Sequence, residues 1–396
     1  MNPTYTPAPV AFLKSGNFLR TWTEQQGEVC QIQSACLSVA KPAPPVAYAP
    51  VKPAPPPAAR KTNLTKLTEA DRMLNVVEAG FKVAGQVSAF SAWLKSPPPP
   101  PKVTPKAAPA PAVKKVPPFD IQEVPNAMRK VGMPMAAKLQ ERWFAGAANY
   151  SRTEKDLRDE IDQNGQRYVP AMVDRTTITL DWVLSFSRAK QAFDELIKEQ
   201  LQTRDALKAL GAILVPHRHL QDISTGSVAS ADLLEFHQKF QFQRISVNAS
   251  WGSRIAEHLD RSLRARGVPD DLTASLGAFN FYAAVRYARF TDLHRYAEVE
   301  HVSVYVRDPY AFTDEQYLGH WNASHVAVVP AHAAAGGWLN YPVVQGSAYD
   351  KGNVLYPVTN KDYRDWRTQH GQGGDFIIYT EPVSVRLETP IRVQLA

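Results

Sequence analysis

The sequence predicts an α+β fold, in which an N-terminal helical half is followed by a largely antiparallel β-sheet and a proline-rich disordered tail precedes both. Most of the 32 prolines lie in the first 118 residues. Apolar residues then recur at steps of three and four up to about residue 236, as in amphipathic helices. After residue 237, apolar and polar residues alternate or β-branched and aromatic residues cluster, as in strands. Because helices come first and strands follow, α+β is favoured over alternating βαβ units.

The first 118 residues form the predicted tail. Its most proline-rich stretches are KPAPPVAYAPVKPAPPPAAR (41–60), PPPPP (97–101) and PKVTPKAAPAPAVKKVPP (101–118). Proline lacks an N–H and has a fixed φ, so such stretches favour extended polyproline spacers over packed cores. The sequence therefore predicts a flexible tail and one globular domain, with these boundaries: 1–118 for the tail, 119–396 for the domain, 119–236 for its helical part and 237–396 for its β-rich part.

Charge is divided unequally between these two parts. Residues 1–118 hold 14 Lys+Arg and 5 Asp+Glu, a net charge of +9, whereas residues 119–396 hold 31 and 33, a net charge of −2. A nearly neutral domain argues against a specific nucleic-acid binder, which concentrates basic residues on its folded surface. The positive charge of the tail either keeps a linker soluble or makes weak contacts with phosphates or an anionic membrane surface.

One amphipathic helix is predicted within the tail, over about 68–94. Thr68 is its expected N-cap, and its apolar stripe consists of Val76, Val83, Val87, Phe90 and Leu94. A single helix between flexible linkers needs a surface that covers such a stripe. Three surfaces stay open: the chain's own domain, a membrane, and a secretion spike, chaperone or adaptor that binds residues 62–95.

The helical half contains two main predicted helices. The first covers 124–150, with Pro134 setting a helix start. The second covers 178–214 and is the longest helical pattern in the chain, with Gly211 expected to end or break it. The charged segment between them, 152–166, is expected to be a surface helix or a loop.

The β-rich half contains five predicted strands and one helix. The helix covers 254–268 and is expected to end at Gly267. The strands are predicted over 240–250, 279–290, 297–308, 324–331 and 375–396.

Several enzyme signatures are missing from the sequence. It has no P-loop, no GxGxxG after a strand, no HExxH, no GxSxG and no paired CxxC. Its two cysteines, Cys30 and Cys36, both lie in the tail, which excludes a nucleophilic cysteine from the domain; the spacing leaves open whether they pair. Because no signal-peptide pattern and no apolar run of about 20 residues occur, we expect a cytoplasmic protein that is secreted only by a route without a cleavable signal.

All ten histidines lie between residues 217 and 370. His217 and His219 have an HxH spacing that suits two metal ligands on a strand, although the same pair fits an exposed loop. His325 and His332 flank an alternating segment and are weaker metal candidates.

The densest polar cluster is EHVSVYVRDPYAFTDEQYLGHWN, residues 300–322. Arg307 falls on the polar face of a predicted strand, which is expected to end at the turn-forming pair Asp308-Pro309. A carboxylate there could hold a divalent cation such as Mg²⁺, while a histidine transfers protons and an arginine or tyrosine steadies phosphate oxygens. The candidate metal ligand is therefore Asp308. The alternative that all residues of this cluster have purely structural roles stays open. The candidate catalytic residues are Arg307, Asp308, Tyr310, Asp314 and His320.

A second polar cluster is NKDYRDWRTQHGQGGDFIIY, residues 360–379. Tyr363, Trp366 and Arg367 would share one helical face, and glycines follow before the next strand. Glycines permit either close backbone approach to a ligand or a tight helix-to-strand turn. If the two clusters meet, the candidate substrate-binding residues are Arg367, His370 and Asp375.

Five blocks of the domain resemble a family of uncharacterised bacterial proteins that is commonly encoded near type VI secretion genes in proteobacteria. The blocks are VPNAMRKVGMPMAAKLQERWFAG, DRTTITLDWVLSF, DDLTASLGAFNFYAAV, VSVYVRDPYAFTDEQYLGHWN and YRDWRTQHGQGGDFIIY. This resemblance covers about 119–390. It implies cargo of a contractile injection apparatus, an effector that reaches the periplasm of a target cell and is matched by a cognate immunity protein.

A local likeness to colicin M-type bacteriocins adds a possible chemistry. Those proteins cleave the lipid-linked peptidoglycan precursor, and their active segment has an Asp-x-Tyr-Asp run followed by a histidine. Asp308-Pro309-Tyr310 matches, whereas Ala311 replaces the second acidic residue, with Asp314 and His320 as substitutes at altered spacing. The likeness implies a metal-dependent phosphodiesterase that uses Mg²⁺.

The expected function is therefore that of a type VI secretion-associated antibacterial effector, a toxin acting in the target-cell envelope. Two alternatives stay open. One is a non-enzymatic adaptor or structural accessory of the secretion machine, which would bind partners through residues 62–95 and the proline-rich arms. The other is a membrane-disrupting toxin that acts through the helix over 68–94.

Overall fold

The computed structural model describes most of the predicted domain and short parts of the predicted tail. The described residues are 36–49, 118–247, 270–327, 341–345 and 354–395, together with the backbone of 12–16, 19–23, 30–32 and 114–116. Contacts divide the chain into two units. The larger unit comprises 37–51, 119–327 and 358–396, and the smaller unit comprises 1–36, 52–118 and 328–357.

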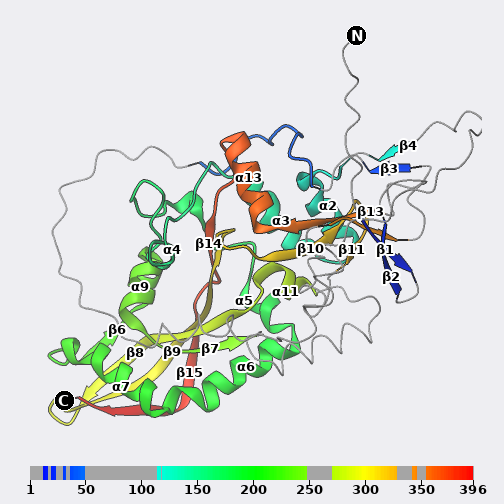
Figure 1. Cartoon of the computed structure of the whole chain (residues 1–396). Coiled ribbons are helices and arrows are strands. Elements are labelled where there is room, and N and C mark those ends of the chain that lie inside the picture. The colour runs from blue at the N-terminus through cyan, green and yellow to red at the C-terminus, as the bar shows by residue number, and fades with distance from the viewer. Residues whose placement is uncertain are drawn as a thin grey trace, which may run out of the picture. The chain divides into compact units, whose positions relative to one another are not determined.

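The larger unit is built on a seven-stranded sheet centred on β9 (Tyr296–Tyr310) and β8 (Phe279–Thr291), which pair along most of their lengths (Figure 1). β8 also pairs with β7 (Gln241–Val247) and β6 (Asp222–Ser224). The other edge of β9 pairs with β15 (Val383–Gln394) and β14 (Phe376–Tyr379). β5 (Val173–Asp174) lies parallel to β14, and the other pairs in this sheet are antiparallel. The α+β fold with a largely antiparallel sheet is therefore confirmed.

Helices dominate the first part of the larger unit, as predicted. The segment over 124–150 forms α2 (Val124–Lys130) and α3 (Pro134–Phe144), and Pro134 takes the first position of α3. The charged segment over 152–166 contains the short helix α4 (Glu154–Arg158). The shorter elements that follow are η3 (Pro170–Met172), η5 (Val215–His217), α8 (Gly226–Ala231), α9 (Leu233–Phe240) and α11 (Asp271–Leu276), with η2 (Ile121–Glu123) preceding α2.

The prediction of one long helix over 178–214 is wrong. The segment consists of α5 (Leu180–Leu184), α6 (Ser187–Lys198), η4 (Gln200–Gln202) and α7 (Arg204–Leu214). Phe186 has an extended backbone between α5 and α6, and Thr203 caps α7 by accepting the N–H of Ala206. Gly211 neither ends nor breaks the helix, since α7 continues to Leu214; a glycine inside a helix costs only about 1 kcal/mol.

Two of the strand boundaries also differ from the prediction. β9 does not end in a turn at Asp308-Pro309, because both residues pair with β14. The pairing of β8 with β9 ends at Val306, so Pro309 lies near an open sheet edge, where a missing N–H is tolerated. The strand predicted over 375–396 is divided into β14 and β15. Of 324–331 the structure describes β11 (Val326–Ala327), which pairs with β10 (Tyr317–Trp321), whereas the helices predicted over 68–94 and 254–268 lie outside the described residues.

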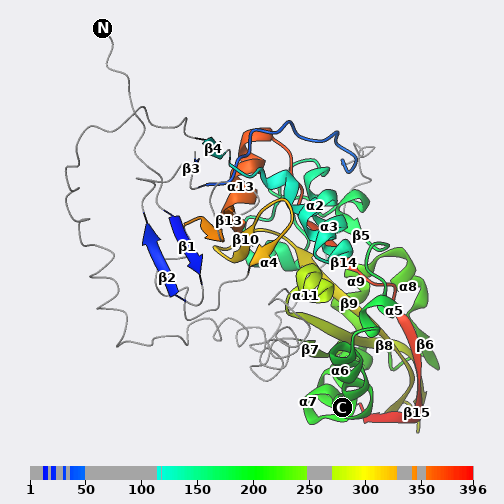
Figure 2. The same cartoon turned by 90° about the vertical axis from the view of Figure 1, so that its right-hand side faces the viewer.

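Both faces of β9 are buried. Val302, Val304 and Val306 lie on one face, and Ser303, Tyr305 and Arg307 alternate with them; all are among the buried residues. Helices α6 and α7 pack on β7, with α7 also on β15 (Figure 2), and α9 packs on β7 and β8. The polar face predicted for this strand is therefore part of the interior and not an open surface.

The smaller unit contains strands on either side of the proline-rich stretches. β1 (Phe12–Gly16) pairs with β2 (Leu19–Thr23) and with β12 (Val343–Gln345), which in turn pairs with β13 (Val354–Thr359). β3 (Cys30–Ile32) pairs with β4 (Lys114–Val116). The side chain of Cys30 lies outside the described residues, so the structure does not test whether it pairs with Cys36.

His237 on α9 makes the stability of the larger unit depend on pH. Its Nδ1 lies 2.9 Å from the hydroxyl of Tyr305. Burial, reinforced by the charges of Arg307 and Arg244, lowers the pKa of His237 to about 3. The unfolded chain therefore binds a proton below about pH 6.5 that the folded chain does not bind until about pH 3. Stability from this residue is present above pH 6.5 and is lost as the pH falls.

We expect His237→Gln to flatten the acid side of the stability profile. The free energy of unfolding of the unaltered chain should fall between pH 6.5 and about 3 by up to about 1.4 kcal/mol per pH unit through this residue, and the variant should lose that contribution. Urea unfolding at a series of pH values measures it. His219→Gln, at an exposed position, serves as the control. An unchanged slope in His237→Gln would contradict the assignment.

Candidate functional site

Residues 37–49, which the sequence places in the tail, form an ordered strap on the larger unit. At its start, the Ser38 N–H donates to the carbonyl of Phe119 at 2.8 Å, and the Ile121 N–H donates back to the carbonyl of Ser38 at 3.0 Å. Leu37 is buried, whereas most other strap residues are exposed or half-buried. The strap is therefore held mainly through its backbone.

The end of the strap is held in the same way at the end of α3. The N–H groups of Ala47 and Tyr48 donate to the carbonyl of Ala145, at 2.9 and 3.2 Å, and the Ala147 N–H donates to the carbonyl of Tyr48 at 2.8 Å. The Tyr48 ring also lies under the guanidinium of Arg142, 4.1 Å from ring centroid to Cζ. This cation–π contact is the main side-chain anchor at this end.

Side chains of the domain bind the middle of the strap through its carbonyl groups. Proline-rich backbone offers acceptors but few donors, so donor side chains suit it. The hydrogen bonds run from Gln122 to the carbonyls of Lys41 (2.7 Å) and Pro42 (3.2 Å), from Gln369 (3.0 Å) and His370 (2.7 Å) to that of Val39, and from Gln372 to that of Pro44 (2.8 Å). We call the surface formed by residues 119–123, 142–147 and 369–372 the strap groove.

Asp375 lies beneath the end of the strap, directly before β14. Its side chain is 1% exposed, and its Oδ1 accepts hydrogen bonds from Trp143 Nε1 at 2.8 Å and from Arg367 Nη2. Arg367 comes from α13 (Asn360–His370). Burial raises the pKa of Asp375, and the charge of Arg367 and the Trp143 hydrogen bond oppose this rise.

The glycines before Asp375 explain how α13 and β14 come so close to α3. Gly371 ends α13 with φ +61°, and Gly373 has φ +102°. A Cβ on Gly373 would lie 2.6 Å from Trp143 Cη2, and one on Gly374 would lie 2.5 Å from the carbonyl oxygen of Ala147. Only glycine fits this approach, so the predicted tight turn is also a close contact.

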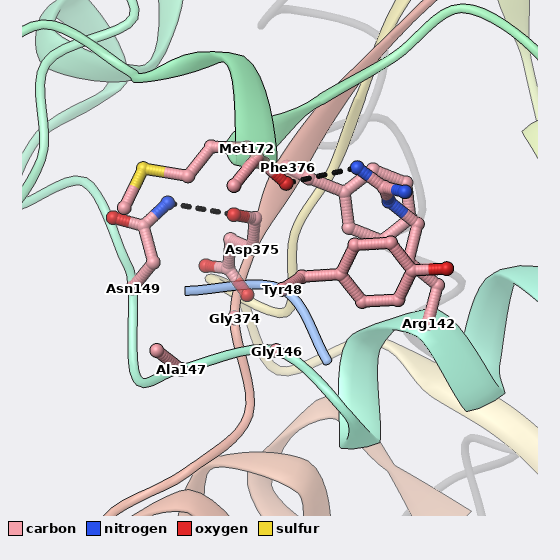
Figure 3. A pocket seen from close by; sticks show the side chains of 10 residues that line it. Tyr48, Arg142, Gly146, Ala147, Asn149, Met172, Gly374, Asp375 and Phe376 are labelled. Carbon is pink, nitrogen blue, oxygen red and sulfur yellow. Dashed lines mark hydrogen bonds between the residues drawn. The ribbon is translucent and has the colours of Figure 1, made fainter. Parts of the chain in front are cut away.

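A small hollow of about 210 Å³ lies beside Asp375 (Figure 3). Tyr48, Arg142, Asn149 and Asp375 are among the residues that line it. Asn149 Nδ2 donates to the carbonyl of Asp375 at 2.6 Å, while Asn149 Oδ1 and Asp375 Oδ2 are buried without a hydrogen-bond partner among the described residues. Buried oxygens of this kind normally bind water or a polar ligand group.

The candidate catalytic residue Arg307 has a structural environment. It is 7% exposed, its Nε donates to the hydroxyl of Tyr379 at 2.9 Å, and its Nη2 donates to Glu160 Oε1 at 3.0 Å. Tyr379 in turn donates to Glu160 Oε1 at 2.6 Å. This arrangement neutralises the buried charge of Arg307 and leaves few of the N–H groups of its guanidinium to bind a substrate.

Asp308 and Tyr310 lie on β9 in different surroundings. The side chain of Asp308 is half-buried and makes no hydrogen bond or ion pair with another described residue, and burial raises its pKa. The Tyr310 ring stacks on that of Phe376 with centroids 4.9 Å apart. Burial and the nearby Asp375 carboxylate raise the pKa of Tyr310, which keeps its hydroxyl protonated at neutral pH.

Two further candidates from the first polar cluster lie outside β9. His320 is buried on β10 and hydrogen-bonds to the hydroxyl of Tyr317, and Asp314 accepts a hydrogen bond from Asn360. The structure therefore brings Arg367, Asp375 and Tyr310 together, and it places His370 on the strap.

The histidine candidates do not form a metal centre in the described part of the chain. His217 lies in η5 with its ring 6.0 Å from that of Phe240, and His219 is exposed. No group of three or more His, Cys, Asp or Glu side chains suited to a metal occurs among the described residues. His332 lies outside them, so its role stays a prediction.

Sequence reasoning missed Tyr48, Arg142, Trp143, Asn149 and Glu160. Gly373 and Gly374 before Asp375 gave the one usable signal, since glycine pairs mark close backbone approach. Nothing in the composition distinguished Tyr48 from the rest of the proline-rich stretch. Across the described residues, no helix is long and apolar enough to cross a membrane.

Comparison with known proteins identifies the domain but no characterised relative. A family model described as a family of unknown function, DUF6402, matches residues 119–395. No curated protein and no solved structure matches the chain.

We expect Glu160→Gln to destabilise the chain by about 3 kcal/mol, because it leaves the buried charge of Arg307 without its carboxylate. Denaturant unfolding at pH 7 measures the change. Glu381→Gln is the matched control: it removes an exposed ion pair with Arg175 and should cost less than about 1 kcal/mol. Equal effects of the two substitutions would show that Arg307 does not depend on Glu160.

Proposed function

The chain belongs to the DUF6402 family, a family of unknown function, and we propose that it is a non-enzymatic accessory of a type VI secretion machine, an adaptor that binds partners through its N-terminal arm. The observation that carries this proposal is the strap. Its hydrogen bonds to η2, α3 and α13 fix the root of the arm on the domain. An arm anchored in this way would keep a bound partner attached to the domain, which an adaptor requires.

The polar residues of the domain favour binding over catalysis. Arg307 and Glu160 neutralise each other in the interior, and His320 is buried against Tyr317. The hollow beside Asp375 is smaller than the pockets of about 300–1,000 Å³ that bind most small substrates. The assignment to type VI secretion rests on the resemblance of the domain to proteins encoded near such genes, and on the proline-rich arm.

The partner of the proposed adaptor is a secretion spike or a chaperone that covers the apolar stripe of the predicted helix over 68–94. Polyproline sequences favour an extended, semi-rigid conformation, so the proline-rich segments on both sides of this helix would hold it away from the domain. Binding of the partner would then cost little conformational entropy in the linkers.

We expect Val83→Asp with Val87→Asp to reduce co-purification of the full chain with a tagged spike protein of the producing strain by about tenfold or more, because two charges would enter the apolar stripe. Ser88→Asp, which lies outside the predicted apolar stripe, is the matched control and should bind normally. Retained binding by the double variant would contradict this role for the helix.

A second candidate function is an antibacterial effector acting in the envelope of the target cell, with a cognate immunity protein in the producer. The observation that favours it is Asp375, a buried carboxyl with a raised pKa beside a hollow, since such a group can act as a general acid. The more specific version is a magnesium-dependent phosphodiesterase acting on lipid-linked peptidoglycan precursor through Asp308. The described residues around Asp308 do not form a set of magnesium ligands, so we derive no step through the ion.

The effector candidate predicts compartment-dependent toxicity. The full chain exported to the periplasm of a susceptible bacterium without the immunity gene should arrest growth, and Asp375→Asn should relieve the arrest by removing the acid. Asp365→Asn, at an exposed position of α13, is the control, and circular dichroism of each purified variant checks folding. Unimpaired growth in both experiments, with the chain in the periplasm and with the chain in the cytoplasm, would contradict a toxin.

A further inference from the structure

The strap contains a short element that the chain repeats. KPAPP occurs at 41–45, within the strap, and again at 52–56, eleven residues later. Extending the alignment on both sides matches the strap segment LSVAKPAPPVAY, residues 37–48, with YAPVKPAPPPAA, residues 48–59.

The second copy meets the hydrogen-bond requirements of the strap groove. The strap residues whose N–H groups donate to the domain are Ser38, Lys41, Ala47 and Tyr48. The equivalent residues of the second copy are Ala49, Lys52, Ala58 and Ala59, all of which have an N–H. Prolines of the second copy fall only at positions where the strap uses no N–H, so none of them removes a donor that the groove needs.

The second copy also has the carbonyl acceptors of the first copy and the lysine of its ion pair. Gln122, Gln369 and Gln372 bind backbone carbonyls, which every residue provides. Lys41 forms an ion pair with Glu123, and Lys52 takes the equivalent position in the second copy. The second copy lacks the aromatic ring that stacks on Arg142, because Ala59 replaces Tyr48. It should therefore bind more weakly than the first.

We propose that residues 48–59 are a second ligand of the strap groove, so that the arm of one chain is held in either of two registers. The registers exclude each other because both use the same donors and acceptors. Moving from the first to the second releases eleven residues on the N-terminal side, about 34 Å of polyproline helix at about 3.1 Å per residue. Both copies belong to one chain, so their competition is intramolecular and independent of protein concentration. This inference does not rest on the proposed role in secretion.

Paired proline substitutions in the full chain test the two registers. Ser38→Pro with Ala47→Pro removes two donors of the first register, and Ala49→Pro with Ala58→Pro removes the equivalent donors of the second. The readout is amide hydrogen exchange at Ile121 and Ala147, whose N–H groups donate to the strap, and at residues 58 and 59 of the second copy.

In the Ser38→Pro/Ala47→Pro variant we expect Ile121 and Ala147 to stay protected while Ala58 and Ala59 become protected. The Ala49→Pro/Ala58→Pro variant should resemble the unaltered chain. The variant with all four prolines should lose protection at Ile121 and Ala147 by about tenfold or more, since no copy remains to bind.

Two results would overturn the proposal. The first is that Ser38→Pro/Ala47→Pro exposes Ile121 and Ala147 as fully as all four prolines, or leaves them protected without protecting Ala58 and Ala59. The second is protection at Ala58 and Ala59 that disappears on dilution, because the groove would then be binding the second copy of KPAPP from another molecule.

Discussion

The carboxylate of Asp375 holds together the part of the molecule on which the strap lies. It accepts hydrogen bonds from Trp143 on α3 and Arg367 on α13, and it directly precedes β14, so one buried acceptor joins two helices to the central sheet. Placing a charge in this interior is expensive, and the guanidinium and indole donors offset that cost only in this geometry. The strap groove depends on the same contact, because most of its residues lie at the C-terminal ends of α3 and α13. The contact thereby supports Gln369, His370 and Gln372, which bind the strap carbonyls.

The order of elements could be predicted because it follows from local patterns. Pro134 begins α3 and Gly371 ends α13, since a proline at the first turn and a glycine in the left-handed region are local backbone effects. The boundaries that failed depend on distant residues. Asp308-Pro309 has the sequence of a turn, but pairing with β14 keeps it extended. The interruption after α6 occurs where Gln243 on β7 binds the carbonyl of Gln200 and the hydroxyl of Thr203. No local pattern contains such contacts.

The candidate site was predicted in part for a related reason. Arg367 and Asp375 were found because they flank glycines within one short segment, and the structure joins them. Arg307 and His320 were chosen by residue type, which does not distinguish a catalytic group from a buried group that needs partners. Arg307 lies between Glu160 and Tyr379, which are far from it in sequence, and this pairing defines its role. The role of Tyr48 could not be predicted from the sequence of the tail, because this role depends on its contact with Arg142, which is distant in the chain.

The strap shows why proline content alone does not decide between a disordered tail and an ordered segment. Proline restricts φ in the unfolded chain, so ordering a proline-rich segment costs less backbone entropy than ordering other sequences. It also removes N–H groups that an exposed segment would otherwise have to leave to water. What such a segment lacks is attraction, and here the domain provides it through the donors Gln122, Gln369, His370 and Gln372. Whether a proline-rich stretch is ordered therefore depends on hydrogen-bond donors elsewhere in the chain. In this chain the domain extends into the tail as far as those donor side chains can bind its carbonyl groups.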